Sequence, residues 1–395
     1  MTPSLGSSDA VAISIVGFFS TYISIMYIRK CRKPTIVCGS GESAELMKQC
    51  PTLNSIYFPF FFAWGKYSQL VLFTGYGYLQ KYLRTVEWKT VRCALEDGEV
   101  MDLDWAQGAS ENGWEESNSI TPILILLHGA MCYNRHLPGQ GWVFEAHRRG
   151  WMVCCMNRRG AKAPLTEPRM NLFGSTDDIR WVLNNFIMTK RPNARILMVG
   201  ISAGSGLLGR YLGDEGELST ITAAMGLAPG YDISVCMGRC TSLVKGYLTG
   251  SVIDSFFNKN AQLLEKIQGS TECISAKDPQ IFLDNSYAIA GYASKDEYYK
   301  ACNPVNVLAN VRTPFMLINA EDDPISVYQN VTENEHLFRT SPSMILVSTK
   351  TGTHCAFWEG FSIHSWAERA TYEFFDEVLR RDADKLCRGI TTISA

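Results

Sequence analysis

The stretch Ile196-Leu-Met-Val-Gly-Ile-Ser-Ala-Gly204 decides the fold, because it carries a buried-type strand straight into a sharp turn. The turn is a G-x-S-x-G pentapeptide, Gly200 to Gly204, with Ser202 at its centre. In this pattern a strand turns abruptly into a helix and holds the serine at a strained backbone angle, so that its hydroxyl projects beyond the sheet. The flanking glycines are needed because a Cβ at either position would collide across the turn.

The pentapeptide is short, so its weight comes from the elements around it. Helical spacing of apolar residues predicts a helix over 175–189 and a closing helix over 365–381. Apolar strands that alternate with helices indicate an α/β fold, with a mostly parallel sheet covered by helices on both faces. The predicted strands are Ile123–Leu127, Trp151–Met156, Arg195–Val199, Ala223–Leu227, Phe315–Asn319 and Met344–Ser348.

The chain divides into four predicted parts. Residues 1–9 form a short tail, 10–28 a membrane anchor, 34–90 an aromatic-rich extension, and 91–395 the catalytic domain. A hairpin that turns near Asp97-Gly98 opens this domain. Residues 230–310 have helical patterning and few strand signals, which predicts a helical cap over the carboxyl edge of the sheet, where ligands of such sheets bind.

The segment Ala10–Ile28 contains no charged residue, and four basic residues follow within 29–33. Nineteen helical residues nearly span a hydrocarbon core of about 30 Å. The long run and the charges on its far side favour an uncleaved signal-anchor over a cleaved signal peptide, and the positive-inside rule puts the catalytic domain in the cytoplasm. We therefore expect a single-pass protein of the endoplasmic reticulum or another internal membrane. A buried helix of the globular domain is the alternative.

Composition excludes several classes of function. The formal net charge of −2 gives no basic excess, so nucleic acid is not an expected partner. The 13 cysteines lack the paired spacing of zinc sites, so neither a metal nor another cofactor is expected. Cys154 and Cys155 stand in an apolar run, where they would pack as small hydrophobes, and the thiols as a whole favour a reducing compartment.

A serine hydroxyl needs a base to take its proton, and the base needs an acid to fix its tautomer. Downstream of Ser202 the strand at 315–319 breaks at a carboxylate pair, and the strand at 344–348 leads by a short loop to His354. In proteins whose nucleophile lies on a G-x-S-x-G turn, the catalytic residues follow the chain order Ser, Asp or Glu, His, which this chain matches. Asp323 directly precedes a proline and is the expected acid, with Asp322 as the alternative.

Two N–H donors must stabilise the oxyanion that forms when the serine attacks an ester. The backbone of Ala203, next after the nucleophile, should supply one. The other should come from the loop after His128-Gly129, at Ala130 or Met131. The remaining histidines, at 128, 136, 147, 336 and 364, fit structural or solvated roles.

With these residues placed, the chain from about Tyr57 to Gly360 resembles the membrane-anchored lipase and phospholipase group of the α/β-hydrolase superfamily. The group comprises the α/β-hydrolase-domain-containing proteins one, two and three and relatives from plants, yeast and bacteria. The resemblance rests, beside the serine turn, on the motifs Trp64-Gly-Lys-Tyr-Ser-Gln69, Asp97-Gly98, Leu103-Asp-Trp105, Asn157-Arg-Arg-Gly160, Leu165-Thr-Glu-Pro-Arg169, Tyr211-Leu-Gly213, Gly291-Tyr-Ala-Ser-Lys-Asp-Glu-Tyr-Tyr299, Asn319-Ala-Glu-Asp-Asp-Pro324, Gly352-Thr-His354 and Glu359-Gly360.

The resemblance implies hydrolysis of carboxylic esters of membrane lipids, as in phospholipases and monoacylglycerol lipases. It leaves open an acyltransferase or esterase on small acyl esters, and a scaffold without catalysis. The chain departs from the group at one loop, where a glycine-rich His-Gly-Gly-x-x-Gly sequence is replaced by His128-Gly-Ala-Met-Cys-Tyr-Asn134. Without those glycines the identity of the second oxyanion donor stays open between Ala130 and Met131, and a narrower acyl site is expected.

Overall fold

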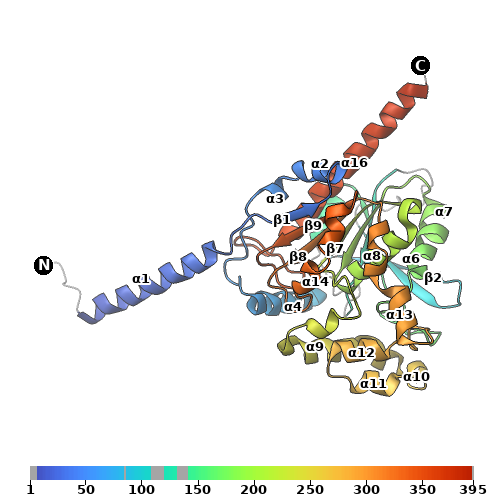
Figure 1. Ribbon diagram of the computed structural model, residues 1–395, viewed down its shortest axis with the longest axis horizontal. Coiled ribbons are helices and arrows are strands. Elements are labelled where there is room, and N and C mark those ends of the chain that lie inside the picture. The colour runs from blue at the N-terminus through green and yellow to red at the C-terminus, as the bar shows by residue number, and fades with distance from the viewer. Residues whose placement is uncertain (1–6, 84–85, 108–119, 131–140, 394–395) are drawn as a thin grey trace.

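A computed structural model describes residues 7–83, 86–107, 120–130 and 141–393. Its core is a nine-stranded sheet in the order β1-β9-β8-β7-β6-β4-β5-β3-β2 (Figure 1). The strands are β1 (Thr35–Cys38), β2 (Trp88–Ala94), β3 (Val100–Ala106), β4 (Ile123–Leu127), β5 (Met152–Met156), β6 (Ile196–Ile201), β7 (Ile221–Leu227), β8 (Phe315–Ala320) and β9 (Met344–Thr349).

The six central strands, from β5 to β9, run parallel, and antiparallel strands close both edges. Side chains of the central strands alternate between two apolar layers. Leu124 and Leu126 of β4 pack on one side, whereas Ile123, Ile125 and Leu127 pack on the other. Since both faces are buried, each central strand reads as a continuous apolar run. The predicted α/β class with a mostly parallel sheet is confirmed.

Helices cover both faces of this sheet. One face carries α2, α3, α5 and α16, and the other carries α6 and α8. The helices are α1 (Ser7–Ile28), α2 (Glu42–Lys48), α3 (Pro51–Asn54), α4 (Lys66–Leu83), α5 (Gly141–Arg148), α6 (Asp177–Trp181), α7 (Met188–Lys190), α8 (Ala203–Glu215), α9 (Ser242–Val252), α10 (Ala261–Leu264), α11 (Ser270–Ser275), α12 (Pro279–Asn285), α13 (Lys295–Cys302), α14 (Gln329–Thr332), α15 (His336–Thr340) and α16 (Trp366–Ile393).

The six predicted strands are present, each within two residues of its expected ends. The hairpin is β2–β3, with Gly98 at a positive φ of 87° in its turn. The helix predicted over 175–189 is interrupted, because residues Val182–Ile187 form a π-helical stretch between α6 and α7. Cys154 and Cys155 are fully buried in β5, as expected of small hydrophobes.

The segment 34–90 contributes to the sheet, which the sequence did not indicate. Its β1 pairs antiparallel with β9, from Thr35 opposite Ser348 to Cys38 opposite Ile345. The sheet therefore reaches beyond the domain boundary expected at residue 91. Between β7 and β8 the chain forms α9 to α13, which lie together below the sheet in Figure 1.

Helix α1 extends away from the body of the molecule (Figure 1). Among the described residues, no helix combines the length and the apolar character that crossing a bilayer requires. The described part of the chain thus does not support the anchor predicted at 10–28, of which the side chains of residues 10–16 lie outside the described set.

Two helical glycines test the packing around α8. A Cβ on Gly213 would lie 2.5 Å from the carbonyl oxygen of Val307, whereas a Cβ on Gly250 of α9 would meet open space. We expect Gly213→Ala to lower the free energy of unfolding by about 1–3 kcal/mol through overpacking. Gly250→Ala should raise it by up to about 1 kcal/mol through helix propensity. Urea denaturation of both variants measures this, and equal shifts would contradict the packing of α8.

Candidate active site

Ser202 sits on a sharp turn between β6 and α8, with φ 53° and ψ −118°. Glycines make this turn possible. A Cβ on Gly200 would lie 2.5 Å from the carbonyl oxygen of Gly204, and a Cβ on Gly204 would overlap the carbonyl oxygen of Leu127 at the end of β4. The strained serine is held by backbone contacts, since its N–H donates to the carbonyl of Leu227. This is the geometry that the pentapeptide predicts.

The structure brings Ser202, His354 and Asp323 together from three separate parts of the chain. The Ser202 hydroxyl lies 2.8 Å from His354 Nε2, and His354 Nδ1 lies 2.7 Å from Asp323 Oδ2. The serine follows β6, the aspartate follows β8 and the histidine follows β9. Because these strands are parallel, their carboxyl ends meet at one edge of the sheet.

The contacts of Asp323 fix the tautomer of His354. Its Oδ1 accepts the N–H groups of Ile325 and Ser326, so Oδ2 is left to accept from the imidazole. A carboxylate can only accept, which places the proton on Nδ1 and leaves Nε2 to accept from Ser202. Burial by itself lowers the pKa of His354, but the charge of Asp323 outweighs it and raises that pKa above 6.5.

Asp322, the alternative acid, faces a different partner. Its Oδ1 accepts the backbone N–H of Thr353 at 2.9 Å. Burial raises the pKa of Asp322 to about 6, although the Thr353 N–H opposes the shift. Asp322 therefore braces the loop in front of the histidine, whereas Asp323 contacts the imidazole itself.

The loop that carries His354 is strained, and the N-terminal segment holds it. Thr353, Cys355 and Phe357 all have positive φ, between 47° and 70°. Such residues persist only where the surroundings over-determine them. The Thr353 hydroxyl donates to the carbonyl of Lys66 at the start of α4.

Further bonds join the same two segments on the far side of the loop. The hydroxyl of Tyr57 and the N–H of Phe60 both donate to the carbonyl of Trp358. These positioning contacts were missed by the sequence reasoning. Only the Lys66 contact falls within a motif that the sequence offered, at 64–69, and the role of that motif is not revealed by the sequence alone.

Ala203 and Ala130 are the expected oxyanion donors that lie among the described residues. Ala203 is the first residue of α8, where backbone N–H groups have no acceptor within the helix. Ala130 follows Gly129, where an added Cβ would lie 3.4 Å from the Cβ of Ser202. Met131, the other candidate, lies outside the described residues.

His128 orients the loop that carries Ala130. Its Nε2 accepts the N–H of Arg158, so its Nδ1 carries the proton and donates to the carbonyl of Gly129. Burial, reinforced by the charge of Arg158, lowers the pKa of His128 to about 3, which keeps the ring neutral. Because a trans peptide points its N–H opposite to its C=O, the N–H of Ala130 faces away from this ring.

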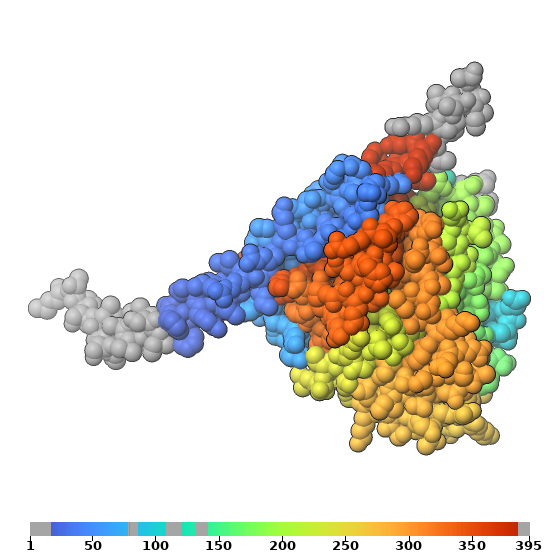
Figure 2. Space-filling view, in the orientation of Figure 1, coloured from blue at the N-terminus to red at the C-terminus, as the bar shows by residue number. Residues whose placement is uncertain are grey.

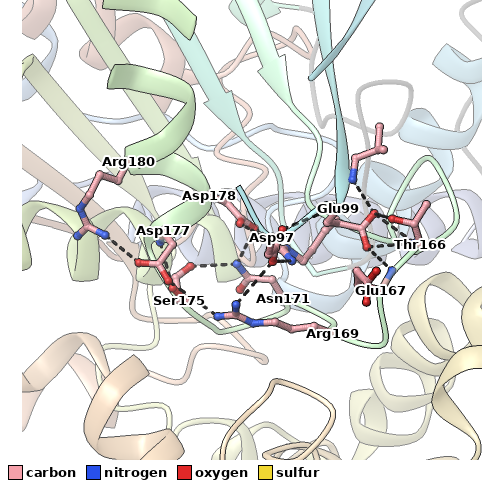
Figure 3. Close-up of polar contacts among 12 residues, drawn as sticks. Asp97, Glu99, Thr166, Glu167, Arg169, Asn171, Ser175, Asp177, Asp178 and Arg180 are labelled. Carbon is pink, nitrogen blue, oxygen red and sulfur yellow. Dashed lines mark hydrogen bonds and ion pairs between the residues drawn. The ribbon is translucent and has the colours of Figure 1, made fainter. Parts of the chain in front are cut away.

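An apolar cluster surrounds the oxyanion positions. Ala130 and Ala203 pack in one group with Leu165 and with Val252 and Phe256 of the segment between β7 and β8. The loop that contributes Leu165 is anchored by polar contacts to the β2–β3 turn, as Figure 3 shows. Apolar side chains therefore pack against Ala130 and Ala203, and a polar network supports the loop of Leu165 from outside.

Glu99 is the most buried member of that network. Its carboxylate accepts both the N–H and the hydroxyl of Thr166, together with the N–H of Glu167 (Figure 3). Beside it, the buried guanidinium of Arg159 pairs with Asp178 and Asp97. These bonds replace the water that the buried charges lose.

Within the described ranges, the other histidines and metal-binding residue types show no second centre. Of the histidines outside the triad, His336 and His364 are exposed, and His136 lies outside the described residues. No group of three or more His, Cys, Asp or Glu suited to a metal ion occurs in the described part of the chain.

Comparison with known proteins matches a family model described as the alpha/beta hydrolase fold over residues 122–361. Phospholipase ABHD3 of Homo sapiens is 25% identical, with 92% of this chain and 88% of that protein covered. Monoacylglycerol lipase of Saccharomyces cerevisiae is 27% identical over 63% of this chain and 58% of its own. Monoacylglycerol lipase ABHD2 of Homo sapiens is 23% identical over 88% and 86%.

The two neighbouring aspartates should separate in their effect on Ser202. Reaction with a fluorophosphonate needs the neutral imidazole, so its rate should rise with pH to a midpoint above 6.5. Asp323→Asn removes the charge that raises the pKa of His354, so the midpoint should move down, and the maximal rate should fall by roughly 10³–10⁴-fold.

Asp322→Asn is the matched control, because its amide oxygen can still accept from Thr353. We expect its midpoint to stay in place and its rate to remain within about tenfold of the original. The pH dependence of labelling measures both variants. A larger loss in Asp322→Asn than in Asp323→Asn would reverse the two assignments.

Glu99→Gln should weaken the support of the wall. An amide offers one acceptor oxygen and adds two donors, which would leave N–H groups of 166–167 unsatisfied. We expect a loss of about 2–4 kcal/mol in the free energy of unfolding. Exchange of the exposed Glu96 by Gln is the control. Urea denaturation measures both, and equal stability would show that the network of Figure 3 contributes nothing.

Proposed function

This chain belongs to the α/β-hydrolase family, and from that premise we propose that it hydrolyses carboxylic esters of lipids with Ser202 as nucleophile. The observation that carries the proposal is the chain of two short hydrogen bonds from Ser202 through His354 to Asp323. Relatives that are named as a phospholipase and as monoacylglycerol lipases support a lipid ester as substrate.

In the first half of the reaction, His354 accepts the proton of Ser202 as the serine oxygen attacks the acyl carbonyl. Asp323 stabilises the imidazolium that forms. The backbone N–H of Ala203 donates to the oxyanion, and a second N–H from Ala130 or Met131 completes the pair. His354 then gives its proton to the departing glycerol or lysolipid oxygen, which leaves an acyl-enzyme on Ser202.

In the second half, His354 takes a proton from water, and the resulting hydroxide attacks the acyl carbonyl. Collapse of this second tetrahedral intermediate releases the fatty acid and returns the proton to Ser202. The steps thus use the three side chains of Ser202, His354 and Asp323, backbone N–H groups and water.

The walls of the site favour an acyl chain. Apolar residues of the 161–172 loop and of the segment between β7 and β8 surround Ala203, the residue beside the nucleophile. An apolar pocket gains about 0.8 kcal/mol for each methylene that it buries. A lipid acyl group therefore binds better here than a short polar one.

We place the enzyme at a cytoplasmic membrane surface, through the uncharged segment 10–28 and the basic residues that follow it. A membrane-bound position raises the local concentration of lipid substrate around the site.

Ser202→Ala tests the proposal directly. The variant should lose labelling by a fluorophosphonate and at least about 10³-fold in hydrolysis of a monoacylglycerol or a phosphatidylcholine. Ser205→Ala, three residues further along in α8, is the control and should remain labelled. Persistence of labelling in Ser202→Ala would exclude this serine, and failure of the unaltered enzyme to release fatty acid from either lipid would exclude the substrate class.

A further inference from the structure

Large apolar side chains stand exposed beside the loop that carries His354. We call them the docking face: Phe58, Phe62, Val71, Leu72, Phe361 and Ile363. Phe62 is 72% exposed and Phe361 is 77% exposed, whereas the neighbouring aromatic side chains of Phe357 and Trp358 are buried. Contiguous exposed apolar patches mark sites of association with another surface.

Ring contacts join the two most exposed members of the docking face and link their segments to α4. Phe361 packs against Phe61 and Phe62, with ring centroids 5.4 Å and 6.1 Å apart. The buried ring of Trp358 touches both Phe60 and Phe73 and so packs the segment at 58–62 against α4. In Figure 2 the blue N-terminal atoms and the orange-red atoms of the later segments adjoin on one side of the molecule.

Short contacts tie this face to the catalytic loop. The Thr353 hydroxyl, one residue before His354, bonds to the carbonyl of Lys66 at the start of α4. The next residue, Tyr67, contacts Thr241, whose N–H donates to the carbonyl of Pro324 beside Asp323. The segment between Phe62 and Val71 is therefore bonded to the loops that carry His354 and Asp323.

The charges around the docking face identify what covers it. Exposed Arg29, Arg32 and Lys33 flank it where α1 joins the body, because Tyr27 of α1 contacts Phe61. The carboxylate of Glu359, two residues before Phe361, is neutralised by an ion pair with Arg369. Apolar rings beside exposed cations complement the acyl boundary and the anionic headgroups of a bilayer.

We propose that the docking face binds the surface of an anionic phospholipid bilayer and delivers lipid to the site. The proposal rests on the function proposed above and deepens it. The catalytic body itself contacts the membrane, with aromatic rings at the level of the headgroups and cations against lipid phosphates. The rim of the active site then opens at the plane from which a lipid ester leaves the bilayer.

Hydrogen exchange of the full-length Ser202→Ala protein, with and without phosphatidylcholine–phosphatidylserine vesicles, maps the contact without turnover. We expect slowed exchange in peptides covering 57–64, 67–73 and 359–364, weaker at high salt and without phosphatidylserine. Protection confined to 7–28, or absent from these peptides, would overturn the docking face.

Rates give the second test. Phe62→Ser combined with Phe361→Ser should lower hydrolysis of vesicle lipid at least about tenfold, with hydrolysis of soluble p-nitrophenyl butyrate unchanged. The control combines Phe144→Ser on α5 with Leu218→Ser before β7, residues that are 53% and 82% exposed. Equal vesicle rates in the two double variants would overturn the proposal.

The two proposals fail in different ways. If the unaltered enzyme hydrolysed neither substrate while vesicles still protected the docking face, the proposed function would fall and the surface would stand. If the butyrate ester were hydrolysed normally while vesicles protected nothing, the reverse would hold.

Discussion

The structure depends on how closely two backbone segments approach at the turn after β6. Gly204 packs against the end of β4 without room for a single carbon, and Gly200 packs against the backbone that follows Ser202. This contact sets the height of the serine above the sheet. It also brings the serine beside Gly129, and hence beside the loop that carries Ala130. The same close contact therefore fixes both the position of the nucleophile and the position of the oxyanion loop.

His354, in contrast to Ser202, is positioned by polar contacts rather than by close backbone packing. His354 lies on a loop with several unfavourable backbone angles, and polar contacts hold that loop in place. The carboxylate of Asp322 accepts the N–H of Thr353, and the carbonyl of Lys66 accepts the Thr353 hydroxyl. The two carboxylates thus have different roles, since Asp322 bonds the loop and Asp323 bonds the imidazole. A strained loop kept by outside contacts allows the imidazole to stay within hydrogen-bond distance of Ser202.

Much of this arrangement could be predicted from the sequence, because local signals and global fold agree. Continuous apolar runs gave the six central strands, and chain order selected Ser202, Asp323 and His354, which the structure brings within hydrogen-bond distance. The pairing of β1 with β9 could not be predicted, since four residues carry too little pattern. The partners of Glu99 and Arg159 lie far along the chain, so motifs at 157–169 were visible while their contacts were not.

The contact between Thr353 and Lys66 bears on where the catalytic unit begins. Residues 35–66 provide an edge strand of the sheet and a support for the histidine loop. The part of the chain that forms the sheet and positions His354 thus starts near residue 35. This is well before residue 122, where the match to the α/β-hydrolase family begins. Recombination or insertion at residue 91 would separate the imidazole from its support, so the aromatic N-terminal region and the sheet must be inherited together.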